Sequence, residues 1–255
     1  MKLSVTFAFA AFVAMLFAIP QASAALVLSE TFSYPDGPLV GAAGSPWTTS
    51  SGTAGQQNVV GGELYLSDNE TEDTRAEFLG TTLATGFTSG SIVATFQMRM
   101  DSADPASSSA TGKYITHFIG DSDELGDPGS FFGRVFVNDG SAGTDFVLGL
   151  SNSAGTASTA FVTELNSDTT YDLTLTLDID SGTSSLSVGG LGTINATDAA
   201  TVARVNAFGF RQTTTTGDQF FDNLAVNTIS AVPEPGSFAM LGLIGLVGLT
   251  NRRRK

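Results

Sequence analysis

Side chains suited to nucleophilic catalysis are present in the chain, but their spacing forms no catalytic pattern. The single histidine, His117, lies in the apolar stretch "KYITHFIG", and no G-x-S-x-G sequence surrounds a serine of the body. That sequence forms the sharp turn which exposes the nucleophile of many serine hydrolases. We therefore expect no triad at His117, and we assign no catalytic residue.

The acidic residues are the next candidates, because carboxylate pairs cleave glycosidic bonds and carboxylate oxygens bind Ca²⁺. The densest acidic stretch is "NETEDTRAE" at 69–77, and its few apolar positions predict a solvated loop. The stretch "GDSDELGDPG" at 120–129 is rich in oxygen ligands, but Leu125 occupies the third ligand position of an EF-hand and no Glu follows at the twelfth. Neither stretch alone defines a site.

Composition narrows the classes of partner and of chemistry. The chain has no cysteine, which excludes disulfides, zinc–thiolate sites and cysteine nucleophiles. The whole chain has 11 Lys and Arg residues and 25 Asp and Glu residues. Six cations and 24 acids of these lie between residues 25 and 231, which gives this segment a net charge of −18. The residues outside it are Lys2, Arg252, Arg253, Arg254, Lys255 and Glu234. Such a segment repels nucleic acids and anionic lipids, and it suits an environment of neutral sugars or divalent cations.

Hydrophobic alternation with a period of two runs through the body and predicts half-buried β-strands. In "TYDLTLTLDID", Leu173, Leu175, Leu177 and Ile179 share one face, and Gly182 follows in a turn that suits a hairpin. Strands are predicted at residues 26–32, 63–67, 91–100, 113–119, 131–138, 145–151, 170–180, 185–190, 206–212 and 220–227.

These elements predict an all-β fold, a two-sheet antiparallel jelly-roll sandwich at 25–229, because no stretch of the body holds a helical apolar period over ten residues. Most of the 19 phenylalanines are expected in its core. Trp47 and the tyrosines could instead form a platform on which sugars stack.

The N-terminus carries the features of a signal peptide. Lys2 precedes an apolar run at 3–19, and Ala22-Ser23-Ala24 presents small residues where signal peptidase reads them. We expect a signal helix within 1–24, cleavage after Ala24 and export of the body.

The C-terminus, 230–255, has three parts: Pro233-Glu234-Pro235, an apolar run at 236–250, and Arg252-Arg253-Arg254-Lys255. The two prolines leave an extended peptide that a processing enzyme could bind. A helix over the apolar run spans about 22 Å, short of a ~30 Å hydrocarbon core, so a single transmembrane helix needs flanking residues or a thinned bilayer. The arginines place its C-terminal end in the cytoplasm.

This ending resembles the PEP-CTERM sorting signal of bacteria that make exopolysaccharide. The resemblance implies that an inner-membrane exosortase recognises Pro233, Glu234 and Pro235, removes the anchor and passes the protein to the cell surface or matrix.

The body resembles concanavalin A-like, LamG-type jelly rolls through "LSETFSYPDGPL", "GGELYLS", "YDLTLTLDIDSG" and "FFDNLAV", in that order. In such modules a structural calcium often joins the first strand to the last, and Glu30 and Asp222 occupy the matching positions. Relatives of the laminarinase type carry catalytic acids as E-x-D-x-x-E, a spacing that does not occur in this chain.

Together these observations predict an exported bacterial protein that binds polysaccharide without catalysis. A divergent glycoside hydrolase and a passive structural or adhesive matrix protein are the alternatives.

Overall fold

The structure, a computed structural model, describes residues 24–230 except 83, 103–105, 107–111, 122–129, 142–144, 162 and 215. The predicted signal helix up to Ser23 lies outside these residues, as do the sorting motif, the transmembrane helix and the arginines of the C-terminus. Most of the acidic stretch at 120–129 also lies outside them. The described ranges contain no helix with the length and apolar character that a bilayer crossing requires.

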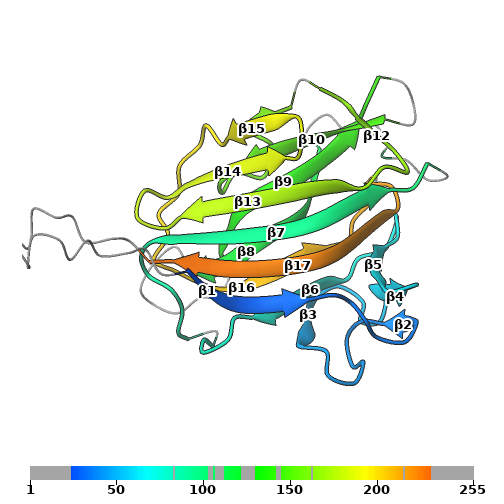
Figure 1. The fold of residues 1–255 in the computed structure, drawn as a ribbon, viewed down its shortest axis with the longest axis horizontal. Coiled ribbons are helices and arrows are strands. Elements are labelled where there is room, and N and C mark those ends of the chain that lie inside the picture. The colour runs from blue at the N-terminus through cyan, green and yellow to red at the C-terminus, as the bar shows by residue number, and fades with distance from the viewer. Residues whose placement is uncertain are drawn as a thin grey trace, which may run out of the picture. The chain divides into compact units, whose positions relative to one another are not determined.

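Residues Ala24–Ile229 form one compact unit of two antiparallel sheets, drawn as two layers in Figure 1. The first sheet, sheet A, has the strand order β15-β14-β13-β7-β17-β5-β4-β2, and β1 also pairs with β17. Its strands are β1 (Ala24–Glu30), β2 (Gly37–Pro38), β4 (Asn58–Val60), β5 (Glu63–Leu66), β7 (Ser91–Met100), β13 (Tyr171–Asp178), β14 (Thr183–Val188), β15 (Gly192–Asn195) and β17 (Gln219–Ile229).

The second sheet, sheet B, has the order β11-β10-β9-β8-β16-β6-β3, with β12 paired to β10. Its strands are β3 (Trp47–Ser51), β6 (Asp73–Glu77), β8 (Lys113–Asp121), β9 (Ser130–Asp139), β10 (Asp145–Ser151), β11 (Thr159–Ala160), β12 (Leu165–Asn166) and β16 (Arg204–Arg211).

The alternation seen in the sequence builds the core between the sheets. Leu173, Leu175, Leu177 and Ile179 are all at most 4% exposed, as their shared face predicts. The hairpin between β13 and β14 is also confirmed: Gly182 has φ +64°, and a Cβ there would lie 1.8 Å from the carbonyl oxygen of Ala200. Each fully buried leucine contributes about 1.5–3 kcal/mol of transfer free energy.

All ten predicted strands are present, with ends that differ by zero to two residues from the prediction. The prediction of a solvated loop at 69–77 is wrong for the second half of this stretch, because Asp73–Glu77 forms β6 and Glu72 is completely buried. The inward residues of β6 are Thr74 and Ala76, which are too small and too polar to produce a visible hydrophobic alternation.

Trp47 belongs to the core and not to a sugar platform. The residue is 2% exposed, and its indole N–H donates to Glu30 Oε2 at 3.1 Å. Most described phenylalanines are buried as predicted: Phe32, Phe78, Phe96, Phe118, Phe132, Phe136, Phe146, Phe161, Phe208, Phe210 and Phe221.

Candidate functional site

The outer face of sheet B, turned away from sheet A, carries an unusual set of side chains. Strand β9 is irregular at Gly133 on this face. Gly133 has φ +57°, and a Cβ there would lie 3.3 Å from the ring of Phe118. Beside this position Phe132 is buried in the core between the sheets, whereas Phe131 and Arg134 are half-buried on the outer face. A strand irregularity that redirects side chains in this way is common next to binding sites.

Five residues from three adjacent strands gather there. The guanidinium carbon of Arg211 lies 4.2 Å from the centre of the Tyr114 ring, and that of Arg134 lies 5.0 Å from it. The ring of His117 lies 4.5 Å from Phe131 and 5.3 Å from Tyr114. We call this set the arginine–aromatic cluster; it consists of Tyr114 and His117 on β8, Phe131 and Arg134 on β9, and Arg211 on β16.

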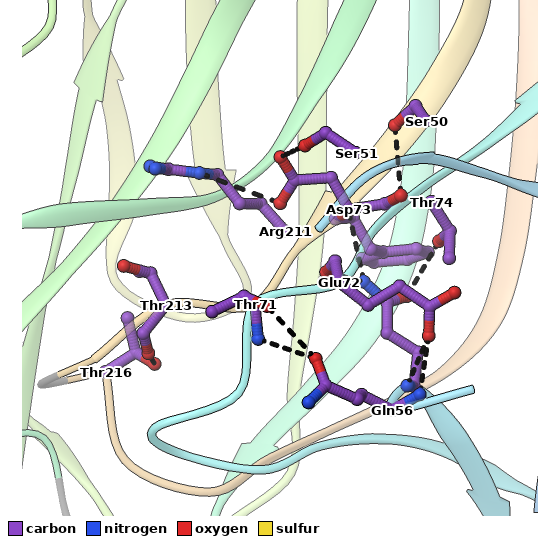
Figure 2. A network of polar contacts seen from close by, with 12 residues as sticks. Ser50, Ser51, Gln56, Thr71, Glu72, Asp73, Thr74, Arg211, Thr213 and Thr216 are labelled. Atoms are coloured by element: carbon purple, nitrogen blue, oxygen red, sulfur yellow. Dashed lines mark hydrogen bonds and ion pairs between the residues drawn. The ribbon is translucent and has the colours of Figure 1, made fainter. Parts of the chain in front are cut away.

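Few acids neutralise these arginines. Arg211 Nε lies 3.7 Å from Asp73 Oδ1, beyond hydrogen-bond distance, and Asp73 also accepts a hydrogen bond from Ser51 Oγ at 2.6 Å (Figure 2). Arg134 donates to the carbonyl oxygen of Ala154 at 3.2 Å and forms no ion pair with a described residue. Planar guanidinium groups whose N–H groups form no hydrogen bond to a carboxylate suit the bidentate recognition of an anion.

The electrostatics of the cluster follow from burial and from its two positive charges. Burial, followed by the charges of Arg134 and Arg211, lowers the pKa of His117 to about 3, so the ring is neutral at physiological pH. Burial also lowers the pKa of Arg134, and the nearby Arg211 adds to this effect. His117 Nδ1 is buried and has no hydrogen-bond partner among the described residues.

A hollow of about 310 Å³ opens beside the cluster on the same face. Its wall includes Phe136, whose ring lies 5.8 Å from that of Tyr114, together with Val147 and Gly149 of β10. Phe136 is buried, yet it stands outside the core between the sheets, consistent with a side chain on the outer face. Ligand pockets range from about 300 to 1,000 Å³, so this hollow is at the small end.

Asp198 fixes the loop that supports Arg134. Its carboxylate accepts backbone N–H bonds from Asn152, Ser153 and Ala154 at 2.9–3.1 Å and the hydroxyl of Ser151 at 2.9 Å. Burial alone would raise the pKa of Asp198, but the hydrogen bonds from Ser153 and Asn152 outweigh it and hold the pKa far below its ordinary value. This loop presents the Ala154 carbonyl oxygen that holds Arg134.

The two residues predicted to bind calcium, Glu30 and Asp222, differ in their surroundings. Glu30 is 5% exposed, and its oxygens accept hydrogen bonds from the N–H of Phe32 at 2.8 Å, the hydroxyl of Tyr34 at 2.7 Å and Trp47. Because hydrogen-bond donors already surround this carboxylate, its oxygens are not free to bind calcium in this arrangement.

Asp222 is half-buried on β17 and accepts a bond from the N–H of Asn223 at 2.7 Å. Burial raises its pKa, and the charges of Glu63 and Glu30 add to this effect, which indicates that the three acids share one region. Among the described residues no group of three or more His, Asp or Glu side chains is placed to hold a metal ion. Calcium at Glu30 and Asp222 therefore stays a prediction.

Sequence reasoning missed Arg134, Arg211 and Phe131 as site residues. It named Tyr114 only among the tyrosines that could stack on sugars, and it set His117 aside as a catalyst. One signal was available: only six cations occur between residues 25 and 231, and Arg134 and Arg211 lie within strongly apolar strands, "FFGRVFV" and "NAFGFRQ".

Comparisons with known proteins agree with this architecture. Basic winged bean lectin, solved with Tn-antigen, is similar over 82% of this chain and 99% of its own, with a TM-score of 0.50 and 11% identity. Peanut lectin is similar over 83% of this chain and 99% of its own, with a TM-score of 0.44 and 16% identity. A sialidase is similar over 77% of this chain, which spans only 18% of the sialidase's length, with a TM-score of 0.45 and 14% identity.

At such identities the likeness concerns the fold alone. No curated protein is similar to the chain in sequence. Residues 231–255 match the PEP-CTERM protein-sorting motif. The chain therefore ends in a PEP-CTERM sorting motif, and its body has the concanavalin A-like two-sheet fold of the legume lectins.

Proposed function

We propose that the protein acts at the bacterial cell surface or in the extracellular matrix, where its sandwich binds polysaccharide without cleaving it. The PEP-CTERM motif implies export, processing by an exosortase and sorting to the cell surface. What we propose beyond this is that the protein binds polysaccharide and that it does not cleave it.

The arginine–aromatic cluster beside the hollow is the observation that carries this proposal. Tyr114 and Phe131 are half-buried, so a ligand can reach part of each side chain. The guanidinium groups of Arg134 and Arg211 lie over these rings, and a sugar would pack against the aromatic surface that the arginines leave open. Arg134 and Arg211 supply several N–H donors around them. Apolar surface with a few convergent polar groups is the usual composition of a ligand site.

The test is retention of the full-length chain, purified in mild detergent, on a glycan array. Tyr114→Ala should weaken retention about tenfold, equivalent to about 1.4 kcal/mol. Tyr65→Ala is the matched control, because Tyr65 is also a half-buried tyrosine but lies on sheet A. Equal retention of the Tyr114 variant and the unaltered protein, or no retention on any glycan, would contradict the proposal.

A second measurement tests the absence of catalysis. Incubation with each retained polysaccharide should release no reducing ends. Release that a single acid-to-amide substitution abolishes would establish the glycosidase alternative instead.

Sorting is tested separately by mass spectrometry of the C-terminus from the native host. We expect the mature chain to end near Pro235. An intact Lys255 would show that the anchor is retained and that no exosortase has removed it.

A further inference from the structure

We infer that the arginine–aromatic cluster binds a polysaccharide that carries carboxylate groups, a polyuronate, and that Arg134 and Arg211 hold the carboxylate. This inference rests on the proposed glycan-binding function and specifies the chemical class of the ligand. It reverses the preference for neutral sugars that the net charge of the body suggested.

The first argument is the distribution of positive charge. Of the six cations between residues 25 and 231, two form close ion pairs: Arg99 donates to Glu63 Oε2 at 2.8 Å, and Arg204 pairs with the buried Asp121. The other four lie on sheet B, and of these only Arg211 has an ion pair among the described residues, a long one with Asp73 at 3.7 Å; they are Arg75, Lys113, Arg134 and Arg211. In a body of net charge −18, this concentration on one sheet favours an anionic ligand.

The second argument is the unmet hydrogen-bonding capacity of these arginines. The Nε atoms of Arg75 and Arg134 are buried and have no hydrogen-bond partner among the described residues. Arg134 has one acceptor, Ala154, and the structure shows none for its other N–H groups within the described ranges. Buried donors usually have partners, and a site that binds an anion is one setting in which they do not.

The third argument is the close approach of two like charges. Arg134 and Arg211 both lie against the ring of Tyr114, at 5.0 and 4.2 Å, and the charge of Arg211 helps to lower the pKa of Arg134. His117 below them is neutral and supplies no compensating charge. A carboxylate that contacts the two guanidinium groups would relieve this repulsion and could form bidentate hydrogen bonds.

The aromatic surface indicates that the anion is attached to a sugar. Tyr114 and Phe131, with ring centres 6.3 Å apart, supply apolar surface next to the guanidinium groups that lie over them, and the hollow lined by Phe136 continues this surface. An isolated inorganic anion would gain nothing from them, whereas a pyranose ring bearing a carboxylate would contact both.

The overall negative charge does not prevent such binding. At physiological ionic strength, charges more than about 8 Å apart in solvent are largely screened, so the local arginines dominate the field at the cluster. Asp73, the acid beside Arg211, is also held by Ser51, and burial raises its pKa.

The test compares native and carboxyl-reduced polymers on the unaltered full-length chain. The probes are polygalacturonate, polyglucuronate and polymannuronate, each before and after chemical reduction of its carboxyl groups to alcohols, with a neutral glucan alongside. We expect at least one native polyuronate to bind, and its reduction to weaken binding at least about tenfold, as the loss of charged hydrogen bonds predicts. This comparison needs no variant and therefore does not depend on a variant's folding.

Variants then locate the site. Arg134→Gln and Arg211→Gln should each weaken binding of that polyuronate about tenfold, whereas Arg99→Gln, which removes the same charge from sheet A, should change it less than about twofold. The fluorescence of Trp47 during urea unfolding checks that each variant is folded.

The remaining outcomes separate the two hypotheses. Equal binding of native and reduced polymers, or equal weakening by all three arginine variants, would overturn the inference and leave the proposed glycan binding in place. No binding of any acidic, reduced or neutral polymer would overturn both.

Discussion

Replacement of Glu72 tests whether a single buried carboxylate holds the loop between β3 and β4. Its Oε2 accepts the backbone N–H groups of Gln56 and Gln57, both at 2.8 Å, and its Oε1 accepts the hydroxyl of Thr49 at 2.6 Å. Glu72 is completely buried, and Figure 2 shows it beside Gln56. The side chain of Gln212, the residue after Arg211, donates to the carbonyl oxygen of Gln56 in this loop at 3.3 Å.

The size of the effect follows from these three bonds. A hydrogen bond to a charged group contributes about 1.5–3 kcal/mol, and a buried donor left without a partner adds a penalty. Since water can reach part-buried Gln56, we expect Glu72→Ala to lower the free energy of unfolding by about 3–5 kcal/mol. Glu72→Gln should cost only about 1–2 kcal/mol, because its amide oxygen can accept both backbone N–H groups while its NH₂ donates to Thr49.

The assay is urea unfolding of the purified full-length chain, followed by the fluorescence of Trp47, the only tryptophan. The control is Glu77→Ala, which removes an exposed glutamate from the same strand region and should change the free energy of unfolding by less than about 0.5 kcal/mol. A Glu72→Ala variant as stable as this control would refute the reasoning. Equal losses for the alanine and glutamine variants would refute the assignment of the effect to hydrogen bonds.

Three further predictions concern pH, backbone geometry and calcium. His117 takes up a proton near pH 6.5 in the unfolded chain but only near pH 3 in the folded protein. The free energy of unfolding should therefore fall as the pH drops from 6.5 toward 3, by up to about 1.4 kcal/mol per pH unit. Urea titrations should show a weaker pH dependence for His117→Gln, and identical curves would contradict the burial of a neutral ring. Gly182→Ala should lower the free energy of unfolding by about 3 kcal/mol or more, since the added Cβ would clash with Ala200. Gly55→Ala, at a residue with φ +86° and open space around the added Cβ, should lower it by only about 1 kcal/mol. Equal losses in thermal melts would show that the contact with Ala200 is unimportant. EDTA should leave Tm unchanged if the donors around Glu30 satisfy its carboxylate, and a fall that calcium reverses would establish the site expected from the resemblance.

The long strands were predictable because each buries one face. In β13 and β7 every second residue is apolar and faces the core, so the period is visible over eight to ten residues. Gly182 was predictable as a turn because it follows Asp and Ser at the end of such a strand. These signals are local in the chain, and they were sufficient for the two-sheet architecture.

The short strands and the candidate site were not predictable for the opposite reason. Strands β2, β11 and β12 have only two residues each, too few to show a period, and β6 buries Thr74 and Ala76. The cluster depends on the pairing of β8 with both β9 and β16, whose residues are about 20 and about 95 positions away in sequence. The irregularity at Gly133, which turns Arg134 outward, is likewise visible only once the strands are paired.

The location of β17 determines when an exported chain can fold. This final strand lies inside sheet A, paired with β7 along one edge and with β5 and β1 along the other. A polypeptide that crosses a membrane from its N-terminus delivers β17 last, so β1, β5 and β7 emerge before their common neighbour and present unpaired edges to the periplasm. Sheet A can therefore be completed only after translocation has passed residue 229, and until then its unpaired edges are exposed to association with other chains.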